Sequence, residues 1–152
     1  RWVHGLTSAG NLGTVNNRKS NFGGRMPVDS LDHYTLRTAE LDATRDFFVD
    51  VLGLTEGYRP PFSFPGHWLY CGDKPIVHLI GSTRELCPPS PDTGALDHVA
   101  LAASDISGFR SRLEGMGIAY DERKVPELNV RQLFVVDPNN VKVELNFPLE
   151  TD

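Results

Sequence analysis

The sequence of 152 residues has few cysteines, no long apolar run and no excess of basic residues. Its two cysteines, Cys71 and Cys87, are too few for a disulfide framework, and their spacing excludes a CxxC zinc site. We therefore expect a reducing, cytoplasmic location. No apolar stretch approaches the roughly 18 residues that span a bilayer. The net charge of −5 disfavours a nucleic-acid partner. The composition therefore argues against a nucleic-acid partner and against a membrane span.

Residues 1–30 differ in composition from the remainder of the chain. They are rich in Gly, Asn and Ser, show no sustained period, and hold four basic residues against one acidic residue. The remaining 122 residues hold eleven basic and nineteen acidic residues. We expect residues 1–30 to be an N-terminal arm, either flexible or not native to the protein, without the apolar segment of a secretory signal.

The rest of the chain contains an internal repeat with an offset of 65 residues. LDHYTLRTAEL at 31–41 matches LDHVALAASDI at 96–106. An amphipathic helix follows each copy, over 41–52 and 105–116, with a glycine after its last turn. Strand-like runs then come at 55–60, 67–72 and 75–80 in the first half, and at 118–125, 130–136 and 140–147 in the second.

Each half is therefore predicted to be a β-α-β-β-β module, and the fold class is α+β. The predicted organisation is module 1 over 31–80, a proline-rich linker over 81–94, and module 2 over 95–148. A module of about 55 residues is too small for a good core of its own. We expect the two modules to pair and to join their sheets into one curved structure.

Four side chains that bind metals occupy repeat-related positions. His33 and His98 are equivalent in the first strands, and His78 and Glu144 lie 66 residues apart in the last strands. Each residue alone would be interpreted as structural, but their joint symmetry favours a metal site. Nitrogen and oxygen ligands without thiolate suit one divalent ion, Zn, Fe, Mn, Ni or Co. Strand alternation places His98 on one face with Ala100, whose small side chain leaves room for a ligand.

Further residues are candidates for substrate binding. Arg37 and Arg131 are suited to a carboxylate or phosphate, and Tyr70 and Tyr120 to a hydrogen bond with a chelated oxygen. Solvated arginines and half-buried core tyrosines are the alternative interpretation. The aromatic, proline-rich segment RPPFSFPGHW at 59–68 either forms the rim of a pocket for an apolar substrate or packs on itself.

The fragments LDHYTLRTAEL, FFVDVLGL, LDHVALAASDI and DPNNVKVEL make the chain resemble the vicinal oxygen chelate superfamily over about 31–148. This superfamily includes glyoxalase I, methylmalonyl-CoA epimerase, fosfomycin-modifying transferases, extradiol dioxygenases and bleomycin-binding proteins. The resemblance implies paired βαβββ modules that form a cupped mixed sheet around one metal site, with His33, His98 and Glu144 as ligands. His78 stands where glyoxalase I has a glutamate and the epimerase a glutamine.

The resemblance implies a divalent-metal-dependent lyase or isomerase of the glyoxalase or epimerase type. In such an enzyme the metal chelates two substrate oxygens and stabilises an enolate. Glu144 or His78 would be the catalytic base. The alternatives are an Fe(II) extradiol-type dioxygenase, a non-catalytic protein that binds a small molecule such as an antibiotic, and, less favoured, a fosfomycin-type transferase. We expect a homodimer. The sequence leaves open the identity of the substrate and whether the metal site forms within one chain or across two.

Overall fold

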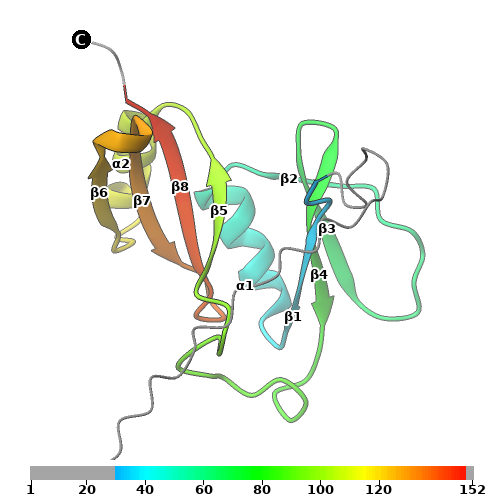
Figure 1. Cartoon of the computed structure of the whole chain (residues 1–152). Helices are drawn as coiled ribbons and strands as arrows, with labels where there is room; N and C mark the ends of the chain where they lie inside the picture. Colours follow the sequence, from blue (N-terminus) through cyan, green and yellow to red (C-terminus); the bar gives the residue numbers. More distant parts are fainter. Residues whose placement is uncertain (1–29, 150–152) are drawn as a thin grey trace, which may run out of the picture. The chain divides into compact units, whose positions relative to one another are not determined.

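The computed structural model describes residues 30–149 (Figure 1). The chain divides into two units between Leu31 and Asp32, and both modules lie in the second unit. The predicted N-terminal arm over 1–30 lies outside the described residues, except for Ser30.

The first module has the predicted order of elements. Its strands form one four-stranded sheet in the order β1-β4-β3-β2, in which β1 is parallel to β4 and the other pairs are antiparallel. The elements are β1 (Tyr34–Thr38), α1 (Leu41–Asp46), the π-helix η1 (Phe47–Val51), β2 (Thr55–Gly57), β3 (Gly66–Cys71) and β4 (Lys74–Gly81). The predicted helix over 41–52 is therefore α-helical only in its first half.

The second module repeats this arrangement, and its sheet has the order β5-β8-β7-β6 (Figure 1). Again the first and last strands are parallel and the other pairs antiparallel. The elements are β5 (His98–Ala102), α2 (Ile106–Gly115), β6 (Asp121–Val125), the 3-10 helix η2 (Pro126–Leu128), β7 (Val130–Val136) and β8 (Lys142–Pro148). The predicted α+β fold of two βαβββ modules is confirmed.

The hydrophobic core lies between the helices and one face of each sheet. Alternate strand residues such as Leu69 and Val77 in the first module, and Leu133 and Val143 in the second, are fully buried. Phe48 of η1 and Leu113 of α2 are buried in the same cluster, which draws on both modules. Burying each such side chain contributes about 1.5–3 kcal/mol. The opposite face of each sheet carries a candidate site residue, His78 in the first module and Glu144 in the second.

Two hydrogen bonds join the modules beside this core. The guanidinium of Arg112 in α2 donates to the carbonyl oxygen of Val51 across 3.1 Å. The amide of Asn139, in the turn between β7 and β8, donates to the hydroxyl of Thr44 across 3.0 Å. Asp137 begins that turn and accepts hydrogen bonds from the backbone of Asn139 and Val141. Burial raises the pKa of Asp137 above its ordinary value.

The predicted joining of the two sheets is not seen among residues 30–149, where the strands form two separate sheets. β1 and β5 each have a partner on one side only, β4 and β8. The modules meet instead through their buried helical faces, which contribute to one core. No helix in this part of the chain has the length and apolarity needed to cross a membrane.

Candidate metal centre

The first pair of candidate ligands, His33 and His78, lies on the exposed face of the first sheet. His33 directly precedes β1 rather than lying in it, and His78 is in β4 opposite Thr35. The two imidazole rings stack with their centroids 3.9 Å apart. The indole of Trp68, opposite His78 on β3, stacks on the same imidazole at 4.0 Å. The imidazole of His78 is therefore held between the rings of His33 and Trp68 on this face of the sheet.

The Nε2 atom of His78 is buried and has no hydrogen-bond partner among the described residues. A buried polar atom without a partner is uncommon in a folded protein and calls for an explanation. Burial, with a smaller effect of the neighbouring His33, lowers the pKa of His78. The neutral imidazole is thus favoured, and this is the form that binds a metal.

The second pair, His98 and Glu144, lies on the corresponding face of the second sheet. His98 begins β5, and Glu144 is in β8 opposite Ala100. The His98 Nε2 atom is 3.2 Å from Oε2 of Glu144. The Glu144 side chain is almost buried, and its Oε1 accepts hydrogen bonds from the amides of Gln132 at 2.8 Å and Asn146 at 2.7 Å. The two amides fix the orientation of this carboxylate.

The register of the strands makes the two pairs equivalent. Thr35 and Ala100 are related by the 65-residue repeat, and their partners in the neighbouring strands are His78 and Glu144 respectively. His78 and Glu144 therefore occupy matching positions in the two sheets, although they are 66 residues apart and the repeat has an offset of 65. The predicted sharing of a face by His98 and Ala100 is also seen, since both are exposed.

An aspartate orients the histidine at the start of each module. Oδ2 of Asp32 accepts a hydrogen bond from Nδ1 of His33 at 2.8 Å, and Oδ1 of Asp97 accepts one from Nδ1 of His98 at 2.8 Å. These bonds lower the pKa of both aspartates. Metal-binding histidines commonly donate their second nitrogen to a carboxylate in this way. The Nε2 atom of each ring is left for another partner.

The four predicted ligands form two pairs rather than one cluster. Within residues 30–149, no group of three or more histidine, cysteine or acidic side chains is placed to hold a metal ion. The donor chemistry of the two pairs nevertheless fits a divalent metal: three imidazoles, one carboxylate, and a buried Nε2 without a partner. A single chain therefore presents two half-sites, which we call the His33/His78 pair and the His98/Glu144 pair.

Arg37 and Tyr70 lie in the first module. Arg37 is exposed in β1, on the same face as Thr35. Tyr70 is already engaged: its hydroxyl donates to the carbonyl oxygen of Tyr58 at 2.6 Å, and its ring lies against Gly57. The guanidinium of Arg37, in contrast, makes no hydrogen bond with residues 30–149, so of the two predicted substrate-binding residues Arg37 is the one whose polar group is available.

Tyr120 and Arg131 make structural contacts in the second module. The Tyr120 hydroxyl donates to Glu114 at 3.0 Å, and this bond raises the pKa of Tyr120. Arg131 donates to Glu122 at 2.7 Å. Because neighbouring residues of a strand point to opposite faces, Arg131 and Gln132 are on different sides of the sheet. Gln132 reaches Glu144, so Arg131 faces away from the candidate site.

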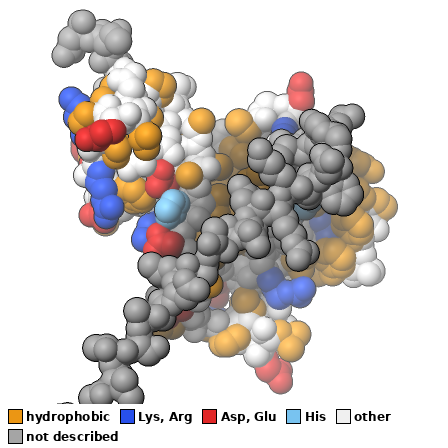
Figure 2. All heavy atoms as spheres, viewed as in Figure 1, with side chains coloured by type: hydrophobic (Ala, Val, Ile, Leu, Met, Phe, Trp, Pro, Cys, Tyr) orange, Lys and Arg blue, Asp and Glu red, His pale blue; other side chains and the backbone are white. Residues whose placement is uncertain are grey.

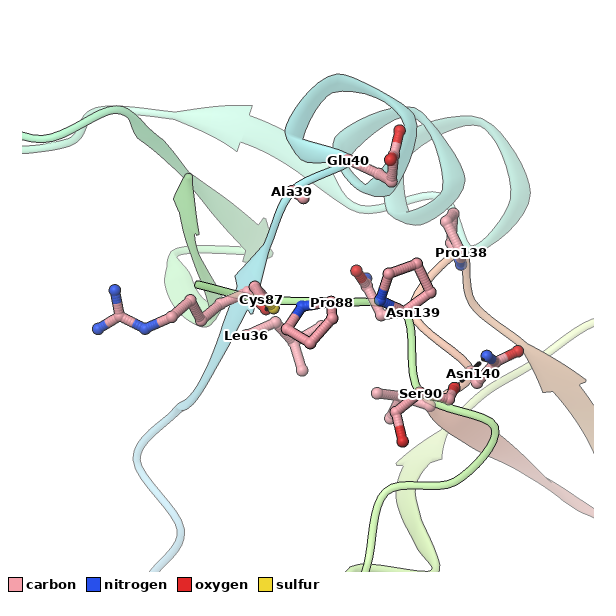
Figure 3. A pocket seen from close by; sticks show the side chains of 12 residues that line it. Leu36, Ala39, Glu40, Cys87, Pro88, Ser90, Pro138, Asn139 and Asn140 are labelled. Atoms are coloured by element: carbon pink, nitrogen blue, oxygen red, sulfur yellow. Dashed lines mark hydrogen bonds between the residues drawn. The ribbon is translucent and has the colours of Figure 1, made fainter. Parts of the chain in front are cut away.

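A pocket of about 190 Å³ lies elsewhere, where β1, the linker and the turn after β7 meet (Figure 3). Asn140 donates to the carbonyl oxygen of Ser90, and the thiol of Cys87 donates to that of Arg37. Glu40, which also lines the pocket, forms an ion pair with Arg84. None of the four candidate metal ligands lines this pocket, so it is a junction between segments and not the candidate centre.

Sequence reasoning missed three kinds of supporting residue. Asp32 and Asp97 orient the histidines, Gln132 orients Glu144, and Trp68 stacks on His78. A signal for the aspartates was present, because both copies of the repeat contain Leu-Asp-His. The roles of Gln132 and Trp68 depend on which residues the strand register brings opposite each other.

A comparison with known protein families identifies the superfamily of the chain. Residues 30–145 match the Glyoxalase/Bleomycin resistance protein/Dioxygenase superfamily. The chain belongs to this superfamily. The predicted resemblance to the vicinal oxygen chelate proteins is thereby confirmed.

Individual members of the superfamily are distant from this chain. It is 28% identical over 138 residues to "Glyoxylase I 4" of Arabidopsis thaliana, covering 84% of this chain and 75% of that protein. It is 27% identical over 119 residues to the glutathione transferase FosA of Serratia marcescens, covering 78% and 81%. A point mutant of the fosfomycin resistance protein FosX of Listeria monocytogenes, crystallised with Mn(II) and 1S,2S-dihydroxypropylphosphonic acid, has the same fold. Its TM-score is 0.62 at 16% identity, covering 80% of this chain and 93% of that chain.

Proposed function

We propose that this protein is a divalent-metal-dependent enzyme, a lyase or isomerase of the glyoxalase or epimerase type. Its substrate would be a small molecule with two neighbouring oxygens that chelate the metal. The observation that carries the proposal is the His98/Glu144 pair, in which Nε2 and Oε2 are 3.2 Å apart while Nδ1 is bonded to Asp97. The similarity to a relative named as a glyoxylase I and to the glutathione transferase FosA also supports a metal-dependent enzyme.

The electrostatics of this pair favour a cation. In a neutral His98 the single ring proton lies on Nδ1, since that nitrogen is bonded to the Asp97 carboxylate. Nε2 and the Glu144 oxygen are then two acceptors facing each other at 3.2 Å. Such a contact is stable only when a proton or a metal ion supplies positive charge. The amides of Gln132 and Asn146 both donate to Oε1 of Glu144, so Oε2 is the oxygen that faces Nε2 of His98.

We further propose that the complete centre forms between two copies of the chain, with the His33/His78 pair of one copy facing the His98/Glu144 pair of the other. Two observations support this arrangement. The four residues do not gather in the described part of one chain, and both histidines His33 and His98 lie at edge strands, β1 and β5, on exposed sheet faces. A two-fold symmetric dimer would contain two such centres.

A metal bound at this centre would act as a Lewis acid on the chelated substrate oxygens. The side chains of this chain would hold and move the proton. Among residues 30–149, both amide donors to Glu144 bind Oε1, which leaves Oε2 to take a proton from the substrate carbon. His78 is the other candidate base, because its lowered pKa favours the neutral imidazole, the form that can accept a proton.

An Fe(II) extradiol-type dioxygenase is the second candidate function. His33, His98 and Glu144 make a two-histidine, one-carboxylate set, which is typical of non-haem iron oxygenases. The stacking of His78 between neighbouring rings favours this alternative, since a clamped imidazole with a free Nε2 could serve as an acid or base without binding the metal.

Elemental analysis of the purified protein tests the proposal first. We expect about one metal ion per chain in the wild type and a loss of metal in His98→Ala. Iron would favour the dioxygenase, and zinc, nickel, cobalt or manganese the lyase or isomerase. His67→Ala is the matched control, because this histidine bonds Glu56 instead of a candidate ligand. Absence of metal from the wild type after reconstitution would contradict the proposal.

Mixing two inactive variants tests the shared centre. His33→Ala and His98→Ala each spoil one half-site, so each homodimer should bind no metal. After unfolding and refolding together, half of the dimers would be mixed, and each would hold one centre with both half-sites intact. Metal content should therefore recover to about a quarter of the wild-type value. No recovery, with dimers present, would place the centre within one chain.

A further inference from the structure

The loop between β2 and β3 presents aromatic side chains to solvent. Phe62 and Phe64 are 46% and 41% exposed, and their rings stack with the centroids 5.3 Å apart and the planes within 6°. Phe62 also lies 6.3 Å from the ring of Trp68 on β3. We call these three residues the aromatic ledge. Figure 2 shows hydrophobic side chains gathered over the part of the first module that carries this loop.

The ledge has a fixed shape. The guanidinium of Arg59 lies 5.0 Å from the centre of each phenylalanine ring and donates to the carbonyl oxygen of Phe64 at 2.8 Å. At the end of the loop, Gly66 allows β3 to approach β4 closely, because a Cβ at this position would overlap the carbonyl oxygen of Leu79. A loop that served only to pack on itself would bury its rings. Here the contacts hold two half-exposed rings in place, and grouped exposed apolar surface commonly marks a binding site.

One residue of the ledge, Trp68, contacts the candidate metal ligand His78. The Trp68 indole is stacked on the His78 imidazole with the planes within 4° and the centroids 4.0 Å apart. A continuous row of rings therefore runs from the exposed loop to the His33/His78 pair. A molecule lying on the ledge would therefore contact Trp68, the residue whose indole stacks on His78.

We propose that the aromatic ledge binds a planar aromatic group of the substrate. The substrate class is then an aromatic compound that carries its two chelating oxygens on or next to the ring. The position of the oxygens rests on the proposed metal enzyme, whereas the stacking of the ring does not require a metal. Each aromatic contact strengthens binding about 2- to 10-fold beyond the burial of apolar area.

Binding of a matched pair of probes to the metal-free protein tests the ledge. 2-Naphthol is planar, and decahydro-2-naphthol has the same skeleton without aromatic rings. Isothermal titration calorimetry should give a dissociation constant for 2-naphthol that is about 10-fold lower. The indole N–H signal of Trp68, assigned with Trp68→Phe, should shift in NMR spectra on addition of 2-naphthol. Equal affinity for the two probes would overturn the proposal.

Replacement of both ledge phenylalanines by leucine identifies the contact. Phe62→Leu/Phe64→Leu keeps exposed apolar side chains, so folding should be preserved. We expect it to weaken 2-naphthol binding about 5- to 50-fold and to leave decahydro-2-naphthol unchanged. Tyr58→Leu is the control, because Tyr58 is in the same loop and its ring is not part of the stack. Unchanged 2-naphthol binding with an altered dimer equilibrium would overturn the proposal and make the ledge an interface between copies.

Metal titration of the same preparations separates the two proposals. Wild-type protein that binds metal but not 2-naphthol would refute the ledge and leave the metal enzyme standing. Protein that binds 2-naphthol in the expected way but no metal would refute the metal enzyme and keep the ledge as an aromatic-binding surface.

Discussion

The carboxylate of Asp97 holds the imidazole of His98 by a hydrogen bond of 2.8 Å between Oδ1 and Nδ1. The bond decides which ring nitrogen carries the proton and turns Nε2 toward Glu144. Asp32 and His33 repeat the same contact in the other module. An orienting partner thus accompanies the histidine of each half-site.

Removing this orienting carboxylate should weaken metal binding. We expect Asp97→Asn to lower metal affinity about 10- to 100-fold, because loss of an outer partner of a metal-binding histidine has effects of this size. Isothermal titration calorimetry with the metal found in the wild-type protein measures the change. Asp50→Asn is the matched control, since Asp50 is exposed in η1, away from the histidines. Equal affinity for the two variants would show that Asp97 has no role in metal binding.

Glu144 should be required for proton transfer. In Glu144→Gln the side chain keeps its size but can no longer accept a proton at Oε2, so we expect exchange of the substrate α-proton to stop. Exchange into deuterated water, followed by NMR with dicarbonyl–thiol adducts as first substrates, measures this step. His78→Gln provides the comparison, because it removes the alternative base. If exchange continues in Glu144→Gln and stops in His78→Gln, the base is His78.

Phe48 should be among the largest single contributors to stability. Its ring is fully buried in the core shared by both modules. We expect Phe48→Ala to lower the free energy of unfolding by about 3–5 kcal/mol, because the substitution leaves a cavity. Leu86→Ala, at a 75% exposed leucine, should change it by less than about 0.5 kcal/mol. Urea denaturation measures both. A small effect of Phe48→Ala would mean that the two modules do not share this core.

Gly66 should tolerate no side chain. A Cβ there would overlap the carbonyl oxygen of Leu79, which belongs to the backbone of β4 and has no room to move. We expect Gly66→Ala to lower the free energy of unfolding by about 2–4 kcal/mol through separation of β3 and β4. Gly115→Ala is the control, because a Cβ at this helix position meets open space, and it should stabilise by about 0.5–1 kcal/mol. Thermal denaturation of both variants measures the difference, and a stable Gly66→Ala would contradict the close approach.

Glu122 should contribute to stability in a pH-dependent way. Arg110 and Arg131 both donate to its carboxylate and hold its pKa below the ordinary 4.5. Because the folded pKa is lower than the unfolded one, the contribution is complete above about pH 4.5 and is lost as the pH falls through the folded pKa. We expect Glu122→Gln to cost about 0.5–1 kcal/mol at neutral pH and nothing in strong acid. Urea denaturation at both pH values measures this; a cost independent of pH would indicate lost packing instead.

The sequence predicted the modules and their faces because both depend on local patterns. The 65-residue repeat, the alternation around His98 and the glycines after each helix are visible in a single chain. The end of α1 as a π-helix from Phe47 was not predictable, since an amphipathic stripe does not distinguish the two helical forms. The sequence grouped the four candidate ligands by symmetry and left open whether they meet within one chain or across two, and the described part of one chain holds them as two pairs. The separation depends on how the modules pack, which no local pattern encodes.

The imidazole of His78 breaks the symmetry between the two modules, because the equivalent residue in the second module is the carboxylate Glu144. With neutral histidines, the four candidate ligands carry a single formal negative charge. A divalent cation held by them would keep a formal charge of +1, whereas a second carboxylate would cancel it. This difference of one charge unit makes the centre more attractive to an anionic chelator. The first module, through His78, would therefore determine which ligand charge the centre favours.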